Sequence, residues 1–390
     1  MKTEQKHSEA NAPQRSILRT FLLALPMMIL TFMMLSHGKP PSDPQRLFAL
    51  ITTYLFFNVF FFLMLRTGRT DRYRAPVFIT YAVAFVISFI SHLVEVRGSM
   101  ALTESTMFQG ETPFCHIVIP MTLIPAALTR TIIFPGTIVG GYASIATMFV
   151  LWIGASLALG RGFCGWACFF GGLDDGFSRL FRKPLIKRIN PSWSYLPFGI
   201  LLAVVLTSAI TLSPTYCTWL CPYKTVTEFA EVTSFKILIQ TIIFVSLFLG
   251  LVVVLPILMK RRTQCGLFCP FGAFQSFTNK VNPFQIRIDT DKCVKCGRCS
   301  QICPTFSMND AGIAKGRSRM TCIKCGKCVD ACPKKAISFN IKGTSLTGSA
   351  ETSRVLFLYP AFLFLATMAG GNVSDAIVRI IRLITTGSMV

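Results

Sequence analysis

Residues 293–304 read CVKCGRCSQICP, and residues 322–333 read CIKCGKCVDACP. Both stretches have the spacing C-x2-C-x2-C-x3-C-P, which holds cubane [4Fe–4S] clusters. Three cysteines at this spacing wrap one cluster through a tight loop, and Gly297 and Gly326 permit the turn. The fourth thiolate cannot reach the same cluster and ligates the other one. The duplicated run therefore predicts two [4Fe–4S] clusters with crossed ligation.

The alternative for these cysteines is a pair of structural zinc sites, which also use C-x2-C pairs. Four cysteines in each run, the duplication and the Pro after the fourth cysteine favour iron–sulfur clusters. We expect a small α+β ferredoxin-like domain over residues 284–342. The predicted ligands are Cys293, Cys296, Cys299 and Cys332 for the first cluster, and Cys322, Cys325, Cys328 and Cys303 for the second.

The rest of the chain has the composition of a membrane protein. Of the 390 residues, 52% are hydrophobic and 14% are charged, whereas soluble domains carry about a quarter charged residues. The sequence predicts an α-helical polytopic membrane protein of about seven spans, with the ferredoxin-like domain inserted before the last span. The apolar runs cover roughly 17–36, 47–65, 75–94, 136–160, 196–213, 236–259 and 355–371.

Two apolar stretches need a separate interpretation: the first apolar run and the stretch 115–134. The first apolar run has no small-residue cleavage site after it, so we expect it to stay as a helix and not to be removed as a signal peptide. The apolar stretch 115–134 is interrupted by Pro120 and Pro125, is followed by Pro135 and carries Arg130. Broken helices at membrane depth lie against protein or a cavity, so this stretch is expected to be re-entrant or half-spanning.

Basic residues predict the orientation of the chain in the membrane. The N-terminal tail and the loops 66–74, 161–195 and 260–262 are rich in Lys and Arg, whereas 95–114 and 214–235 are poorer. The positive-inside rule then predicts a cytoplasmic N-terminus and ferredoxin domain, and the C-terminus outside. The expected regions are a cytoplasmic tail (1–16), a transmembrane bundle (17–260), a juxtamembrane segment (261–283), the ferredoxin domain (284–342), and the last span with a tail (355–390), of which 372–385 is expected along the interface.

The net charge of +22 does not indicate nucleic-acid binding. Residues 280–342 hold 13 Lys and Arg against 4 Asp, but they lack a pattern of basic and aromatic residues for stacking on bases. The basic charge either docks an acidic redox partner or anionic lipid, or forms a solvated face. Both interpretations stay open at this point.

Three further cysteine pairs lie in the membrane part at the spacing C-x3-C. The segments are FCGWACFFGG from Phe163, YCTWLCPY from Tyr216 and QCGLFCPFGA from Gln264. Cysteines at i and i+4 face the same side of a helix, so two pairs can offer four thiolates to one metal centre. The topology predicts one shared site at the inner edge, formed by Cys164, Cys168, Cys265 and Cys269, and a second site at the outer edge, formed by Cys217, Cys221, Cys115 and His116.

The alternative for these pairs is that membrane cysteines are small apolar packing residues. Three pairs at one spacing argue against it. The metal is left open: an iron–sulfur cluster is favoured, and zinc or copper are the alternatives. Near the pairs, Asp174 and Asp175 are expected to cap a helix. Of the histidines near the predicted outer edge, His37 and His92 are expected to be interfacial, and His116 follows Cys115 directly.

Together these elements resemble a known family. Membrane C-x3-C-P elements followed by a duplicated C-x2-C-x2-C-x3-C-P module are similar to the NapH/NosR/CcoG group of membrane-bound polyferredoxins, over roughly residues 138–335. Cys221-Pro222 and Cys269-Pro270 fit the pattern, whereas Phe169 follows Cys168. The resemblance implies a protein of the bacterial inner membrane that transfers electrons across or along this membrane to a periplasmic enzyme, or that has a role in the assembly of metal centres. A flavin-attachment domain of the NosR kind is not visible in the sequence.

Two functions from different classes remain. The first is an electron-transfer subunit of an oxidoreductase, which connects a cytoplasmic or quinol donor to a redox partner in the membrane or at its outer face. The second is a metal-handling or assembly factor for a respiratory enzyme. Motifs for hydrolysis or for dinucleotide binding are absent from the sequence. The expected partners are membrane lipid, redox proteins and a larger membrane complex, and a bound quinone or flavin is compatible with the sequence.

Overall fold

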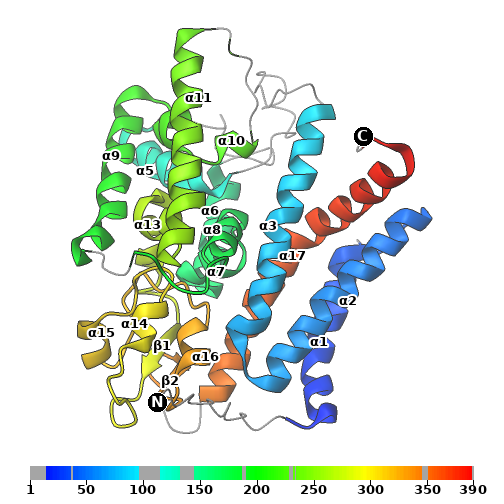
Figure 1. The fold of residues 1–390 in the computed structure, drawn as a ribbon, viewed down its shortest axis with the longest axis vertical. Coiled ribbons are helices and arrows are strands. Elements are labelled where there is room, and N and C mark those ends of the chain that lie inside the picture. Colours follow the sequence, from blue (N-terminus) through cyan, green and yellow to red (C-terminus); the bar gives the residue numbers. More distant parts are fainter. Residues whose placement is uncertain are drawn as a thin grey trace, which may run out of the picture.

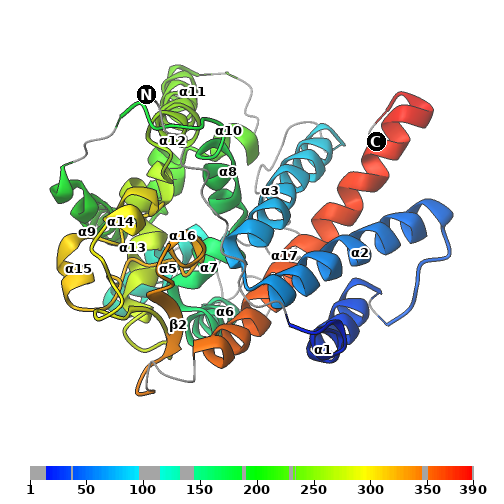
Figure 2. The same cartoon turned by 60° about the horizontal axis from the view of Figure 1, so that its bottom comes forward.

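The computed structural model describes residues 15–36, 38–95, 115–131, 145–186, 190–227, 232, 234–344 and 350–388. Long helices form most of the molecule, and a small domain with two short strands lies at one end of them (Figure 1). The helices form two groups (Figure 2): α1, α2, α3 and α17 pack together, and α5 to α13 form the second group, to which α3 connects through α8. The small domain contacts both groups.

The helices of the first group are long, whereas those of the second group range from 4 to 16 residues. In the first group these are α1 (Ile17–Ser36), α2 (Pro44–Thr67), α3 (Thr70–Glu95) and α17 (Ala350–Thr386). In the second group they are α5 (Ile119–Thr129), α6 (Ile145–Ala158), α7 (Phe163–Trp166), α8 (Phe169–Phe177), α9 (Leu196–Thr211), α10 (Lys224–Thr227), α11 (Phe235–Leu247), α12 (Leu255–Met259) and α13 (Pro270–Thr278).

Five helices in the described part of the chain are long and apolar enough to cross a membrane. They cover Ile17–Ser36, Pro44–Thr67, Ser192–Thr211, Phe235–Met259 and Ala350–Thr386. A sixth candidate is the pair Ile145–Ala158 and Gly160–Trp166, which is bent by 102°. In the first and fourth of these helices, only 22% of the most apolar 18-residue stretch is buried inside the protein. The exposed apolar side chains need an apolar solvent, which a bilayer supplies.

These helices coincide with most of the predicted spans, while the count of seven stays a prediction. The predicted span 75–94 lies in α3, whose side chains from residue 89 onward, including that of His92, are outside the described residues. His37 and the beginning of the predicted span 136–160 are also outside them. In the described part of the stretch 115–134, the turn His116–Val118 leads into the 11-residue helix α5, which contains Pro120 and Pro125. The re-entrant or half-spanning element stays a prediction.

The last helix differs from the expected span and interfacial tail. It runs without a break over 37 residues from Ala350 to Thr386. It packs along α1, α2 and α3, and its first turns contact the small domain (Figure 1). The apolar residues that recur at helical spacing in 372–385 continue the helix of the predicted span, and α17 packs against α3.

The small domain is built on two antiparallel strands. Strand β1 (Phe284–Ile288) pairs with β2 (Ile337–Ile341), so that Phe284 lies opposite Ile341 and Ile288 opposite Ile337. The helices α14 (Arg298–Ile302), α15 (Asp310–Ala314) and α16 (Lys327–Ala331) complete it. A ferredoxin-like α+β arrangement is therefore present between α13 and α17, where the cysteine runs predict it.

The two halves of this domain repeat the same backbone conformation. Gly297 and Gly326 have φ of 67° and 84° before α14 and α16. Lys295 and Lys324, at matching places in the two runs, also have positive φ, at 52° and 49°. A non-glycine residue in this region is uncommon, so the duplication in sequence is a duplication in structure.

The membrane part contains a repeat of its own. An apolar helix ends at a residue with positive φ, which is Gly160, Leu212 or Lys260. The C-x3-C segment follows: Cys164–Cys168 over α7, and the pairs Cys217/Cys221 and Cys265/Cys269 over the π-helical turns Tyr216–Leu220 and Gln264–Phe268. A short helix (α8, α10 or α13) comes after the second cysteine, whose backbone is extended in all three copies.

Candidate iron–sulfur sites

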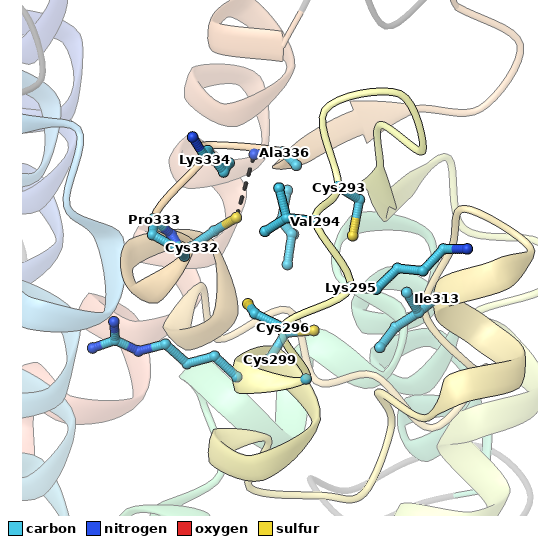
Figure 3. A pocket seen from close by; sticks show the side chains of 13 residues that line it. Cys293, Val294, Lys295, Cys296, Cys299, Ile313, Cys332, Pro333, Lys334 and Ala336 are labelled. Atoms are coloured by element: carbon cyan, nitrogen blue, oxygen red, sulfur yellow. Dashed lines mark hydrogen bonds between the residues drawn. The ribbon is translucent and has the colours of Figure 1, made fainter.

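The first cysteine set of the small domain surrounds one cavity (Figure 3). Its walls include Cys293, Cys296 and Cys299 from the first run and Cys332 from the end of the second. The backbone N–H of Ala336 donates a hydrogen bond to the Cys332 sulfur at 3.3 Å. Four thiols around one cavity and an N–H directed at a sulfur fit a cubane cluster, which carries negative charge.

The second set is more deeply buried. Cys303, Cys325 and Cys328 are 7%, 7% and 9% exposed, whereas Cys296 of the first set is exposed to solvent. Burial raises the pKa of Cys328 well above its usual value, and the neighbouring thiols of Cys325, Cys322 and Cys303 raise it further. The Ser307 N–H donates to the Cys303 sulfur at 3.2 Å, four residues after the cysteine, as Ala336 does for Cys332.

The membrane cysteines of the first and third pairs meet at a second cavity. Cys164, Cys168, Cys265 and Cys269 line it together with Phe170 and Phe271 and with Ile117, Tyr223, Gln264 and Gly272. All four cysteines are buried. Cys168 and Cys269 stand at the N-terminal ends of α8 and α13, and the Gly272 N–H donates to the Cys269 sulfur at 3.4 Å. Helix N-termini favour negative charge, so this cavity also suits an anionic thiolate-bound centre.

His116 lies beside this cavity, although the loop charges predict that it belongs to a separate site at the outer edge. Its Nε2 atom is 3.0 Å from the Cys168 sulfur. The predicted separation of His116 from Cys168 across the membrane is therefore wrong. The reason is that the chain enters the bundle at the short turn His116–Val118, which packs against α13.

The second pair also lies closer to the cavity than expected. Gln264, next to Cys265, donates a hydrogen bond to the Tyr216 hydroxyl at 2.9 Å, and Tyr216 precedes Cys217. Tyr223, two residues after Cys221, lines the cavity, and its hydroxyl donates to the Phe170 carbonyl at 3.2 Å. The separate outer-edge location predicted for Cys217 and Cys221 is not what the structure shows, because the segment after α9 turns back into the bundle.

The small domain is joined to the membrane part through the second cysteine run. The Trp166 indole N–H donates to the Lys324 carbonyl at 3.1 Å. The Lys324 amine is buried, and it donates to the Leu159 carbonyl at 2.9 Å and to the side-chain oxygens of Asn279 and Asn282 at 2.7 and 2.8 Å. Burial lowers the pKa of Lys324 to about 7. The loop that carries Cys322 and Cys325 is thus fixed to the helices that carry the membrane cysteines.

A buried ion network lies beside the same contact. Asp175 is paired with Arg262 at 3.0 Å, with Arg74 at 2.9 Å and with Arg179 at 3.3 Å. Burial alone would raise the pKa of Asp175, but Arg262, Arg179 and Arg74 hold it well below its usual value. Asp71 completes the network through Arg74 and Arg179, both at 2.7 Å.

Arg262 connects this network to both parts of the protein. Its guanidinium donates to the Cys164 carbonyl at 3.1 Å, and its backbone N–H donates to the Pro304 carbonyl at 2.9 Å. Asp174 accepts the Cys265 N–H at 2.9 Å, and burial raises the pKa of this carboxyl to about 7. The helix-capping role expected for Asp174 and Asp175 is wrong, since Cys168 is the N-cap residue of α8 and both acids lie within the helix.

Sequence reasoning missed Lys324, Trp166 and the network around Asp175. The basic members of the network look like ordinary loop charges under the positive-inside rule. Two adjacent acids in a chain with only 17 acidic residues were the available signal. Within the described residues, no three His, Cys, Asp or Glu side chains converge on one point as they would around a single metal ion.

The comparisons with known proteins agree with this geometry. A family profile described as "4Fe-4S dicluster domain" matches residues 285–333. A second, described as "4Fe-4S binding domain", matches 141–188, 193–240 and 241–288. Each of these three stretches contains one C-x3-C pair, so the repeat seen in the structure is also a repeat of the profile.

Relatives occur in bacteria and archaea. The chain is 31% identical over 175 residues to the uncharacterized protein MJ0750 of Methanocaldococcus jannaschii. This match covers 42% of this chain and 67% of MJ0750. It is 27% identical over 172 residues to YccM of Escherichia coli, named for electron transport, with 42% of this chain and 47% of YccM covered. It is 27% identical over 169 residues to the ferredoxin-type protein NapH of Haemophilus influenzae, with 43% and 53% covered.

The matched region thus spans about half the length of YccM and of NapH. No solved structure matches the chain. The apolar helices and the cysteine-lined cavities define a membrane iron–sulfur protein of the ferredoxin type. The chain belongs to the family of NapH/NosR-type membrane-bound polyferredoxins, whose members include electron transport proteins.

Proposed function

We propose that this protein carries electrons between a redox partner at its ferredoxin domain and a centre held by its membrane cysteines. The proposal assigns four ligands to each of three centres. The ferredoxin ligands are those of the crossed arrangement, and the membrane centre is held by Cys164, Cys168, Cys265 and Cys269. Each [4Fe–4S] cluster, when bound, accepts and returns one electron.

Iron–sulfur clusters suit the membrane cavity better than single ions. Its donor set is four thiols, the ligands that such clusters use. These thiols surround one cavity, as the cysteines of the first ferredoxin site do. The aromatic rings of Phe170 and Phe271 make part of its walls apolar.

The observation that carries the proposal is the contact between the second ferredoxin run and the first membrane pair. Gly165 of the CGWAC segment packs on the Ile323 carbonyl, and the neighbouring Trp166 binds the Lys324 carbonyl. Cys322 and Cys325 flank these two residues, and Cys164 and Cys168 flank the glycine and the tryptophan. The ligand-bearing loops of the second ferredoxin centre and the membrane centre are thus in direct contact.

The two ferredoxin sites differ in exposure, which supports an order for the path. Cys296 of the first site is exposed, and Val294 beside it is 57% exposed, so a partner can approach this site. Lys295, Arg298 and Lys334 around the cavity would attract an acidic redox partner. The buried second site contacts the membrane part. The proposed path therefore runs from the exposed site through the buried one to the membrane centre.

The proposed setting is a bacterial inner membrane, with the ferredoxin domain in the cytoplasm. The basic residues of the ferredoxin domain and of the loops beside it support this orientation. Cys115, Cys217 and Cys221 are proposed to extend the path beyond the membrane centre, because Tyr216 and Tyr223 place the second pair beside the same cavity. A quinone, a flavin or a partner subunit would accept electrons there.

Proteoliposomes with the ferredoxin domain outside and an impermeant acceptor trapped inside test the proposal. Chemical reduction of the external ferredoxin centres should reduce the internal acceptor in the presence of quinone. Cys265→Ser should stop this transfer and leave the ferredoxin EPR signals intact. Protein-free liposomes give the background rate. If the wild type passes no electrons inward, with quinone and the partner added, the proposal fails and a role in metal handling becomes the better explanation.

A further inference from the structure

His116 has one polar contact of unusual kind. Its Nε2 atom lies 3.0 Å from the Cys168 sulfur, well within the range of a hydrogen bond to sulfur. The residue opens the short turn His116–Val118, which follows Cys115 and precedes the broken helix α5. A contact between residues 52 positions apart is therefore made by the fold and not by the local chain.

Aromatic rings from two other segments enclose the imidazole. The ring centroids of Phe163 and Phe271 lie 5.2 and 5.0 Å from that of His116, at steep interplanar angles, and that of Phe170 lies 5.8 Å away. Edge-to-face contacts of this kind favour one ring orientation. The ring is thus held with its Nε2 directed at the sulfur.

His116 is placed to support a ligand and not to be one. The four thiols of Cys164, Cys168, Cys265 and Cys269 line the cavity, and Ile117 lines it too, but His116 is not among its walls. A neutral imidazole protonated at Nε2 donates one hydrogen bond. Hydrogen bonds to the sulfurs stabilise the more negative, reduced state of a cluster and raise its reduction potential.

The repeat shows that this bond is an addition. In the third pair, the sulfur of Cys269 receives the backbone N–H of Gly272, three residues further on. Cys168 occupies the matching place in the first pair: its sulfur accepts from the backbone of Gly171, also three residues further on, and has the imidazole of a distant segment beside it as well. The two pairs also differ in sequence after the second cysteine, since Phe169 follows Cys168 whereas Pro270 follows Cys269.

We propose that the His116 Nε2–H donates a hydrogen bond to the Cys168 sulfur and sets the reduction potential of the membrane centre. The inference rests on the proposed function, because it takes Cys168 as a ligand of that centre. His116 is a positioning residue in this role. It favours the reduced membrane centre and so makes electron delivery from the ferredoxin domain more favourable.

The test is an EPR-monitored redox titration of the purified whole protein and of three variants. His116→Phe keeps an aromatic ring but removes the donor, His116→Gln keeps an amide donor, and Phe163→Leu disturbs the ring packing while keeping the imidazole. All should retain the iron content and the signal of the membrane centre. His116→Phe should lower the potential of that centre only, and His116→Gln should restore much of the difference. For a one-electron couple, a tenfold change in the ratio of reduced to oxidised centre is about 59 mV.

An unchanged potential in His116→Phe would overturn the inference. An equal fall in Phe163→Leu would assign the effect to packing, and loss of the iron and the signal in both His116 variants would make His116 a ligand. Either result also overturns the inference. Failure of the proposed function would look different, because the wild type itself would then lack a membrane signal in addition to those of the ferredoxin domain.

Discussion

Gly165 lies against the backbone carbonyl of Ile323, so closely that a Cβ atom at position 165 would be 2.5 Å from that oxygen. The glycine of the third pair makes a similar approach, since a Cβ at Gly266 would be 3.3 Å from the Phe306 ring. The second pair has Thr218 at this place. The glycine after the first cysteine thus distinguishes the two pairs that contact the ferredoxin domain.

Gly165→Ala should weaken the contact between the two parts of the protein. The added methyl group meets backbone, which cannot move aside as a flexible side chain can, and overpacking of this kind costs about 1–3 kcal/mol. We expect a lower melting temperature and slower electron transfer from the ferredoxin domain to the membrane centre. Calorimetry and rapid-mixing absorption measurements check the two effects.

Gly154→Ala is the matched control. Gly154 lies in α6, and a Cβ there would meet no atom within 4 Å. Alanine favours the helix over glycine, so this variant should be as stable as the wild type or slightly more stable. Equal loss of stability in both variants would contradict the role given to Gly165.

Asp175→Asn should destabilise the protein strongly. Asp175 is fully buried among Arg74, Arg179 and Arg262. Removing one partner from a buried ion pair leaves charge uncompensated and costs about 3–5 kcal/mol. The free energy of unfolding, measured by denaturant titration in detergent, checks the effect. Asp289→Asn, which removes only the surface pair with Lys292, should leave the stability unchanged.

The difference between wild type and Asp175→Asn should depend on pH. The folded protein holds the pKa of Asp175 well below its usual value, so its stabilising effect is complete above the unfolded pKa of about 3.9. It decreases as the pH falls below that value toward the folded pKa. The two proteins should therefore differ equally at pH 7 and pH 5, and less at pH 3. A difference that grows on acidification would exclude this account.

Crossed ligation predicts which cysteine variants behave alike. Cys332→Ser should remove the same EPR signal as Cys293→Ser, because both residues line one cavity although they belong to different runs. Cys303→Ser should match Cys322→Ser in the other signal. The whole protein should contain about four iron atoms fewer in each variant, as one cubane requires. Pairing within each run, with Cys303 matching Cys293, would refute the assignment.

The orientation in the membrane predicts which positions react from outside the cell. Ser194, just before α9, accepts a hydrogen bond from Arg319 of the ferredoxin domain, so Thr211 lies at the far end of this 16-residue helix. Lys183 is exposed and follows Arg182, whose carbonyl accepts from Lys260, and the neighbouring Arg261 donates to the Ser300 carbonyl of the ferredoxin domain. In intact cells, an impermeant thiol reagent should label Thr211→Cys but not Lys183→Cys, relative to the parent protein. Both should be labelled after the cells are opened. The reverse order in intact cells would mean that the ferredoxin domain faces outward.

The grouping of the ferredoxin cysteines could be predicted from the sequence because its determinants are local. Three of the four ligands of each cluster lie within seven residues, and the spacing itself limits how the loop can fold. The exchange of the fourth ligand follows from the same limit, and Cys332 does line the cavity of the first run. The apolar spans are local in the same sense, since the length of a run against the thickness of a bilayer identifies them.

The membrane site could be predicted only in part. The equal spacing of the pairs indicated that Cys164, Cys168, Cys265 and Cys269 belong together, and they do line one cavity. Loop charges assigned His116 and the second pair to the opposite edge. That inference assumes straight spans, whereas the segments at His116 and at Tyr216 turn back into the bundle, where they contact Cys168 and Gln264.

The sequence alone determined the cofactor class, the membrane setting and the three C-x3-C repeats, because each depends on residue spacing or composition along a short stretch. The tertiary structure alone decided that His116 meets Cys168, that Asp175 joins Arg74 and Arg262, and that Ile323 lies on Gly165. The partners in such contacts lie 52 residues apart in the pair His116–Cys168 and 158 residues apart in the pair Trp166–Lys324. Contacts of this kind arise from the packing of whole helices and a docked domain, and a local pattern contains no record of them.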